Sequence, residues 1–185
     1  MNTNIFPVQS ARLTLRRFQE KDLPAFVVYR SDPEIAEYQS WTSITDEEAR
    51  EYIQRQQQNE FALPGRWFQV AIAQKETDVI IGDIGVCLRA VDPTCAEIGF
   101  TLSKENQGKG FASEAVRLMF KIIFDQTEVE RIEGIVDSRN LASINLLSRL
   151  GMKNEKTEEV FFKGSLCTEY TFIISKTDWL TTNSV

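Results

Sequence analysis

The chain contains no histidine among its 185 residues. This absence excludes Ser-His-Asp and Cys-His catalysis, and it excludes any metal site that needs a histidine ligand. It also removes the side chain whose unperturbed pKa lies nearest neutrality. A general base in this protein must therefore be a carboxylate with a raised pKa or a chain of water molecules.

Cysteine, long apolar runs and basic charge are also scarce. The three cysteines, Cys87, Cys95 and Cys167, lack metal-ligand spacing, so we expect free thiols in a reducing cytoplasm and no bound metal. Without a membrane-length apolar run or a signal-peptide pattern, we expect no membrane association. The net charge of −6 argues against nucleic-acid binding. It suits a cationic acceptor such as an amine, although mild acidity also simply favours solubility.

The remaining composition is typical of a globular protein, with 42% apolar and 26% charged residues. The length suits one domain with one core, which we expect to span residues 1–180. Residues 181–185 are expected to form a frayed tail.

Hydrophobic periodicity predicts an α/β fold with a mixed sheet. Thr45 and Glu48 form a capping box at the start of one helix, and Leu118 and Ile122 belong to the apolar face of another. The predicted helices span residues 22–30, 45–59, 110–125 and 142–150. The predicted strands span residues 12–18, 67–73, 79–88, 95–102, 131–136, 160–163 and 168–175.

A glycine-containing turn between the fourth strand and the third helix is the most informative segment. Gly108 and Gly110 allow sharp backbone turns, and the helix that follows presents unpaired amides and a positive dipole end. Such a place binds a phosphate or pyrophosphate group. A P-loop is excluded because Phe111 follows Gly110, and the dinucleotide fingerprint narrowly fails at Ser113. An ordinary loop before a helix remains the alternative.

The spacing Gln107-x-x-Gly110-x-Ala112 resembles the pyrophosphate loop of the GNAT acetyltransferases, which bind acetyl-CoA. The segment from Asn140 to Met152 resembles a second GNAT motif. Further segments resemble the RimJ/RimL branch, which acetylates ribosomal-protein N-termini: residues 10–18 with Asp22, residues 31–34, Trp41 and residues 81–85. Together the matches run in family order from about residue 10 to residue 174.

The resemblance implies a GNAT fold, in which a mostly antiparallel sheet of about seven strands is flanked by four helices and the fourth and fifth strands splay apart. Acetyl-CoA would lie in the gap. The residues implied to hold it are Phe100, Leu102, Gln107, Gly108, Lys109, Gly110, Phe111, Ala112, Asn140 and Ser143. Asn140 also suits a plain helix N-cap, and both roles are compatible.

Acetyl transfer further needs a base for the amine and an acid for the leaving thiolate. Many GNAT members carry the acid, a tyrosine, seven residues after the asparagine, where this chain has Leu147. Ser143 resembles a serine with this role in the RimJ/RimL branch, but it also suits a structural helix residue. Glu97 is the first candidate for the base, although it also suits an ordinary strand carboxylate.

Glu169 and Glu114 are weaker candidates for the base. Tyr38 and Trp41 are candidates for lining the acceptor pocket, with core packing expected for one of them. The resemblance therefore predicts a cytoplasmic N-acetyltransferase that transfers acetyl directly to a primary amine, first of all a protein N-terminal α-amine. The alternatives are a small-amine acetyltransferase and a non-catalytic acyl-CoA sensor. A homodimer is implied at family level only.

Overall fold

The computed structural model defines residues 5–183 and contains one mixed sheet of eight strands in the order β1-β2-β3-β4-β5-β6-β8-β7. All neighbouring strands are antiparallel except β5 and β6. The strands are β1 (Val8–Gln9), β2 (Leu13–Arg16), β3 (Phe68–Gln74), β4 (Ile80–Leu88), β5 (Cys95–Leu102), β6 (Arg131–Asp137), β7 (Lys153–Phe162) and β8 (Ser165–Ser175).

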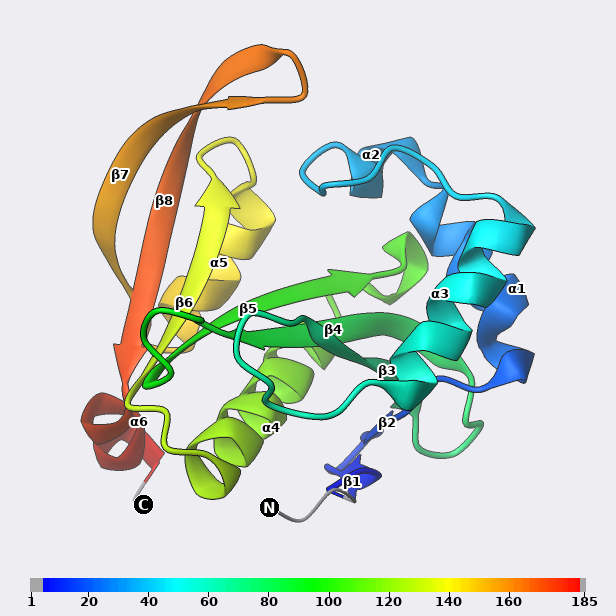
Figure 1. Ribbon diagram of the computed structural model, residues 1–185, viewed down its shortest axis with the longest axis horizontal. Helices are drawn as coiled ribbons and strands as arrows, with labels where there is room; N and C mark the ends of the chain where they lie inside the picture. The colour runs from blue at the N-terminus through cyan, green and yellow to red at the C-terminus, as the bar shows by residue number, and fades with distance from the viewer. Residues whose placement is uncertain (1–4, 184–185) are drawn as a thin grey trace.

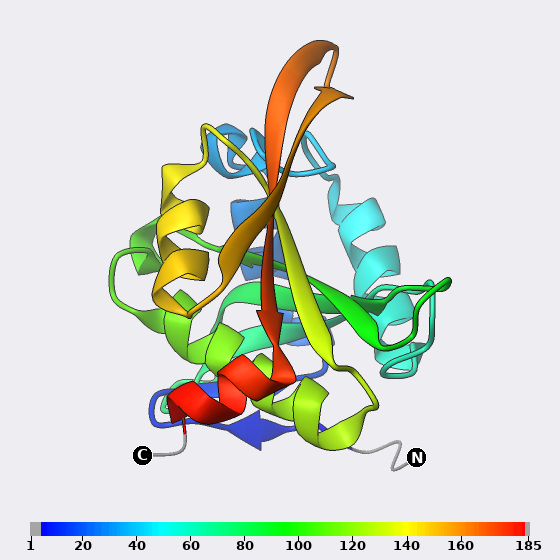
Figure 2. The same ribbon diagram turned by 90° about the vertical axis from the view of Figure 1, so that its left-hand side faces the viewer.

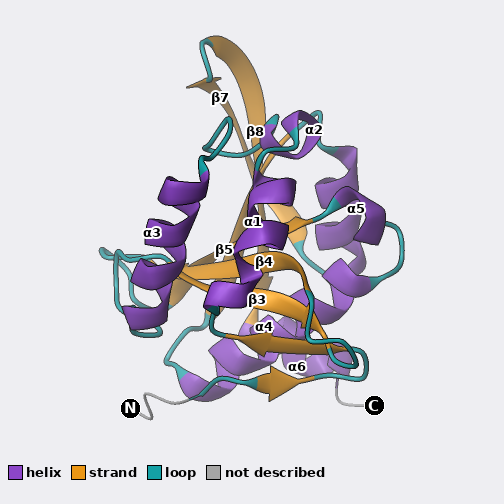
Figure 3. Cartoon of the chain, turned by 90° about the vertical axis from the view of Figure 1, so that its right-hand side faces the viewer, coloured by secondary structure: helices purple, strands orange, loops and turns teal. Residues whose placement is uncertain are grey.

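Helices cover both faces of this sheet. They are α1 (Leu23–Arg30), α2 (Pro33–Ala36), α3 (Asp46–Gln58), α4 (Phe111–Gln126), α5 (Leu141–Arg149) and α6 (Lys176–Asn183), with short 3₁₀ turns at Glu20–Asp22 and Lys104–Asn106. Figure 3 shows α1 and α3 in front of the strands, with α4 and α6 behind them. The GNAT-type mixed fold is confirmed, with one strand and two helices more than we expected.

Alternation along the central strands explains the two layers. In β3, Phe68, Val70 and Ile72 point into the larger core beneath α4, α5 and α6. Ala71 and Ala73 point the other way, into a smaller core beneath α1 and α3. Large residues on one face and alanines on the other therefore fix how closely each helix layer approaches the sheet.

The parallel pair β5–β6 is short. Cys95, Ala96 and Glu97 pair with Arg131, Ile132 and Glu133, and the pairing then stops. Beyond these residues the two strands diverge, as Figures 1 and 2 show. We call this point the fork. The splay of the fourth and fifth predicted strands is thus confirmed, and it opens the sheet beside the end of β5.

The β7–β8 hairpin is much longer than expected and projects from the body of the protein (Figure 2). We expected its first strand to cover residues 160–163, but β7 begins at Lys153. The charged run at its start hides the strand, because β7 is an edge strand exposed over most of its length and lacks alternation. At the tip, the Lys163 ammonium donates to the carbonyls of Ala36 and Trp41, each at 2.6 Å.

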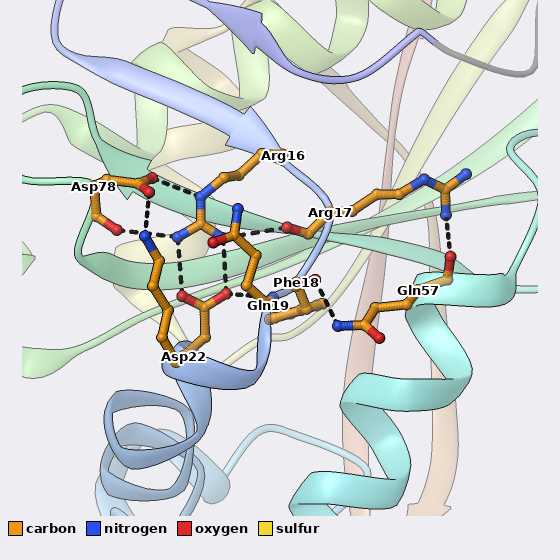
Figure 4. Close-up of polar contacts among 8 residues, drawn as sticks. Arg16, Arg17, Phe18, Gln19, Asp22, Gln57 and Asp78 are labelled. Atoms are coloured by element: carbon orange, nitrogen blue, oxygen red, sulfur yellow. Dashed lines mark hydrogen bonds and ion pairs between the residues drawn. The ribbon is translucent and has the colours of Figure 1, made fainter.

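The segment after β2 is held by a buried arginine (Figure 4). Arg16 donates to both carboxylate oxygens of Asp22 at 2.7 and 2.9 Å and to Asp78 at 2.6 Å. These bonds tie the start of α1 and the β3–β4 turn to the edge of the sheet. The neighbouring Arg17 instead donates to carbonyls at the end of α3, among them Gln57 at 3.1 Å.

Three short elements escaped prediction. β1 has only two residues and α2 only four, so neither shows a periodic pattern. α6 packs through Trp179 against Phe120 and Phe124, a contact far apart in sequence. This helix includes residues 181–183 of the expected tail, and residues 184–185 lie outside the described range. None of the helices within residues 5–183 has the length and apolar character needed to cross a membrane.

Candidate active site

A cleft of about 700 Å³ opens beside the fork. It lies between the end of β5, the start of α4, one side of α5 along its whole length and the segment around α2. The residues that line it are Glu34, Ile35, Tyr38, Gln39, Phe100, Thr101, Leu102, Lys104, Asn106, Gln107, Gly108, Gly110, Phe111, Ala112, Ser113, Asn140, Ala142, Ser143, Asn145, Leu146 and Arg149. The two predicted motifs therefore meet at one cavity, although residues 113–139 separate them in sequence.

The turn before α4 forms one end of this cleft. Gly108 and Gly110 have positive φ values of +73° and +81°, a conformation that glycine adopts at little cost. Gly110 is the N-cap of α4, and no side chain caps the helix. The first helical bond runs from the Glu114 amide to the Gly110 carbonyl, so the amides of residues 111–113 have no partner within the helix.

The glycines of this turn have different surroundings. A Cβ added at Gly108 would meet no protein atom within 4 Å, whereas one at Gly110 would lie 3.4 Å from the Arg12 guanidinium. Gln107 lines the cleft but donates through its side-chain amide to the Leu102 carbonyl at 3.1 Å, which braces the turn against β5. Lys109 lies outside the lining and offers its carbonyl to Arg12.

The end of β5 forms a second wall. Phe100 and Leu102 both line the cleft. On one side β5 pairs with β4 as far as Leu102, but on the other its pairing with β6 stops at Glu97. Residues 98–102 therefore present a strand edge without a strand partner in the described part of the chain, and such an edge can pair with an extended ligand.

The N-terminus of α5 forms a third wall. Asn140 is its N-cap, with the side-chain oxygen accepting from the Ser143 amide at 3.1 Å. The structural reading of Asn140 is thus confirmed, and its side-chain NH₂ donates to no group within residues 5–183. The Ser143 hydroxyl makes no hydrogen bond among residues 5–183 and belongs to the cleft lining. Leu147 is buried against Gly134, so position 147 serves the core here.

Glu97 is the last paired residue at the fork, and it lies outside the lining of the cleft. Its neighbour Ile98 points into the larger core, so the Glu97 side chain points to the opposite face of the sheet. Arg89 contacts the Glu97 carboxylate at 3.0 Å and also binds Glu133 at 3.0 Å. Burial raises the pKa of Glu97 above its ordinary value; Arg89 opposes this, while Glu133 and Glu169 add to it.

Further carboxylates stand on the same face beyond the fork. Asp137, Glu169 and Glu158 lie directly opposite one another on β6, β8 and β7. Arg139 pairs with Asp137 at 2.6 Å, but the Glu169 carboxylate has no ion pair or hydrogen bond within the described chain. Burial, together with Asp137 and Glu158, raises the pKa of Glu169. This face therefore carries a surplus of negative charge beside Glu97.

Tyr38 and Trp41, both considered for the acceptor pocket, are placed differently. Tyr38 lines the cleft. Trp41 lies outside it and stacks on the Arg30 guanidinium at 3.7 Å. Arg30 in turn binds Asp83 at 3.0 Å, and Tyr29 donates to the same carboxylate at 2.7 Å. Trp41 therefore packs over a buried ion pair and leaves the cleft open.

Several lining residues were not predicted. Asn145 and Arg149 stand one helical turn apart on α5, on the face that also carries Ala142, and this spacing after Asn140 was an available signal. Glu34 reaches the cleft through α2 and contacts Lys104 at 2.6 Å. That contact joins residues seventy positions apart, and no local pattern announces it.

The hydrogen-bonding groups along this cleft suit a long anionic thioester such as acetyl-CoA. The amides at the start of α4, which have no partner within the helix, and the open space over Gly108 can receive a pyrophosphate. The unpaired edge of β5 can receive an amide-bearing arm, which the uncommitted NH₂ of Asn140 could also contact. No group of His, Cys, Asp or Glu side chains within the described chain is arranged to hold a metal ion.

Comparison with known proteins gives a consistent result. The family description "Acetyltransferase (GNAT) domain" matches residues 12–153. An uncharacterized N-acetyltransferase, p20 from Bacillus licheniformis, is 36% identical over 171 residues, which cover 91% of this chain and 95% of the relative.

Solved structures show the same fold at lower sequence identity. A GNAT-family acetyltransferase from Bacillus anthracis has a TM-score of 0.81 at 22% identity and covers 93% of this chain and 99% of its own. RimL, a ribosomal L7/L12 alpha-N-protein acetyltransferase solved in complex with coenzyme A, has a TM-score of 0.74 at 19% identity, covering 90% and 95% of the two chains.

Proposed function

The chain belongs to the GNAT family of acetyl-CoA-dependent N-acetyltransferases, and from this premise we propose that it acetylates the α-amine of a protein N-terminus, as the RimJ/RimL branch does. The observation that supports the proposal is the fork: β5 and β6 separate after Glu97, and the uncapped start of α4 lies beside the edge of β5 that this separation leaves open. The likeness to RimL and the N-terminal motif of residues 10–18 support this choice of acceptor.

Two regions follow from this arrangement. The cofactor side comprises residues 107–112, the edge of β5 and the start of α5. The acceptor side comprises the opposite face around Glu97, the segment 33–44 and the tip of the β7–β8 hairpin. Acetyl-CoA, when bound, supplies an activated acetyl thioester. The backbone amides of residues 111–113 would hold its pyrophosphate, and the edge of residues 98–102 would align its extended arm.

The amine arrives mostly protonated, because a peptide α-amine has a pKa of roughly 7.7–8.0. Glu97, with its raised pKa, would accept that proton directly or through one water. The Ser143 hydroxyl lines the cleft and has no partner in the described part of the chain; it would donate a proton where the thiolate leaves, with water as the alternative donor.

A direct transfer fits the thiols of this chain. Cys87, Cys95 and Cys167 are all free. Burial raises the pKa of each of them, that of Cys95 to about 12, so none is an activated nucleophile. We infer that no acetyl-cysteine forms. Free thiols also suit a cytoplasmic setting.

A small cationic amine is the second candidate acceptor, favoured by the row of Asp137, Glu169 and Glu158 beside Glu97. A turnover assay decides between the two acceptors: thiol release from acetyl-CoA is measured with peptides of neutral or basic N-terminal sequence, and with polyamines and amino sugars. Turnover of peptides alone supports the first proposal, and turnover of small amines alone replaces it with the second. Tight acetyl-CoA binding without turnover of any amine would contradict both.

A further inference from the structure

We propose that Arg12 is a positioning residue for the cofactor loop, residues 107–112. It holds this loop in the conformation that receives a pyrophosphate, and it neutralises Glu114, the acidic residue in the first turn of α4. The proposal rests on the proposed function, since it takes the cofactor side as the acetyl-CoA site. Arg12 lies just before β2, about one hundred residues from the loop in sequence, and it does not line the cleft.

The backbone of Arg12 is fixed by the sheet. Its carbonyl accepts from the Lys75 amide at 2.9 Å, and its own amide donates to Glu114 at 2.8 Å. Ser10 donates to the same carboxylate at 2.7 Å. The position from which the Arg12 side chain extends is therefore set by β2, β3 and the first turn of α4 together.

The guanidinium then contacts the loop at three places. Its Nη1 donates to the Lys109 carbonyl at 3.0 Å, its Nε donates to Glu114 at 2.7 Å, and its carbon lies 4.5 Å from the centre of the Phe111 ring. It also packs on Gly110, where an added Cβ would lie 3.4 Å away. One side chain thus bridges the residues before and after the glycine at the helix start.

The bond to Lys109 has a consequence for ligand binding. In a trans peptide the carbonyl of one residue and the amide of the next point in opposite directions. Because the Lys109 carbonyl is held by Arg12 outside the cleft, the Gly110 amide is turned toward the cleft that Gly110 lines. The same bond keeps a carbonyl oxygen away from the space where a phosphate would lie.

The bond to Glu114 removes an electrostatic conflict. A free carboxylate one turn into α4 would repel an anionic ligand at the helix start. Burial acts to raise the pKa of Glu114, but the hydrogen bonds from Ser10 and Arg12 outweigh it and hold the pKa below its ordinary value. The carboxylate is therefore ionised, and Arg12 provides the matching positive charge.

Calorimetric titration with acetyl-CoA tests this assignment in the full chain. Variants Arg12→Ala, Arg12→Lys, Glu114→Gln and Arg12→Ala/Glu114→Gln are compared with wild type, with circular dichroism checking each fold. We expect Arg12→Ala to weaken binding about tenfold, within the range of coupled charge pairs, and Arg12→Lys to weaken it less. The double variant should bind more tightly than Arg12→Ala, because the unpaired carboxylate is gone.

Kinetics separate positioning from general stability. Arg12→Ala should raise KM for acetyl-CoA while kcat at saturation is retained. Arg17→Ala is the matched control, since Arg17 flanks the other end of β2 but binds carbonyls at the end of α3. Wild-type affinity in folded Arg12→Ala, or a double variant no better than Arg12→Ala, would overturn the assignment. Failure of the wild type itself to bind acetyl-CoA would instead refute the proposed function.

Discussion

The cofactor side and the acceptor side meet at the fork but are built from different parts of the chain. On the cofactor side, the proposed contacts to a ligand would come from backbone amides, glycines and a strand edge, within two continuous segments of the cleft lining around residues 100–113 and 140–149. On the acceptor side, the proposed contacts would come from charged side chains on separate elements, such as Glu97 on β5 and Glu169 on β8. The cofactor side depends on the local backbone conformation of two segments. The acceptor side depends on how the sheet brings together side chains that are far apart in sequence.

This difference suits what each side would recognise under the proposed function. A pyrophosphate can be held by any backbone that turns correctly, so the residues there need chiefly to be small. An amine acceptor is distinguished by charge and shape, which only side chains provide. The hairpin tip adds to this through Lys163, which fastens β7–β8 to the segment 33–44 by binding the Ala36 and Trp41 carbonyls. Changes on the acceptor side should therefore alter acceptor use while leaving acetyl-CoA binding intact.

The largest effect is expected from Asp83→Ala. Asp83 is 1% exposed and holds Arg30, so its loss leaves a buried guanidinium without a counter-ion, at a cost of about 3–5 kcal/mol in the free energy of unfolding. Urea denaturation measures this. Asp125→Ala, which breaks the exposed Lys121–Asp125 pair, should cost less than about 1 kcal/mol. Equal losses of stability in the two variants would contradict a structural role for the buried Asp83–Arg30 ion pair. Asp83→Ala protein that remains folded should still bind acetyl-CoA.

Glu97→Gln should next lower kcat by at least about tenfold with acetyl-CoA affinity retained, because a general base is typically worth about 10²–10⁴ in rate. The active form of Glu97 is the anion, and its pKa is raised. Wild-type activity should therefore fall as the pH drops through the raised pKa of Glu97, which lies above the ordinary glutamate pKa of 4.5. The pH–rate profile of the variant should lack this acidic limb. Glu133→Gln, which removes the carboxylate directly opposite, is the control. Full activity with an unaltered acidic limb would make Glu97 an ordinary strand residue.

A smaller effect is expected from Ser143→Ala. It should lower kcat more than it changes acetyl-CoA affinity. The loss should stay below the roughly 10² of a full general acid, because water can replace the hydroxyl in an open cleft. Ser148→Ala, on the exposed face of the same helix, provides the comparison. If the two variants have the same kcat, Ser143 is a structural residue of α5.

Local patterns predicted the local backbone geometry well. The glycine turn, the Thr45–Glu48 capping box and the Asn140 N-cap each depend on residues within a few positions, and all are present. Contacts between distant charges were not predictable, because Arg12 could pair with any carboxylate and the sequence does not say that Glu114 is the one. The expectation that one of Tyr38 and Trp41 packs in the core is met by Trp41, which stacks on Arg30, but the sequence did not say which of the two it would be.

The acetyl-CoA affinity of Gly110→Val, measured by calorimetry beside Gly164→Val, tests the central claim most directly. Both glycines have nearly the same φ, +81° and +83°, so both substitutions strain the backbone alike. Only Gly110 lies at the start of α4, where valine would disturb the helix start and press on Arg12. We predict at least about a tenfold loss of affinity, or roughly 1.4 kcal/mol, for Gly110→Val alone. Unaltered binding by folded Gly110→Val would contradict the claim that this loop holds acetyl-CoA.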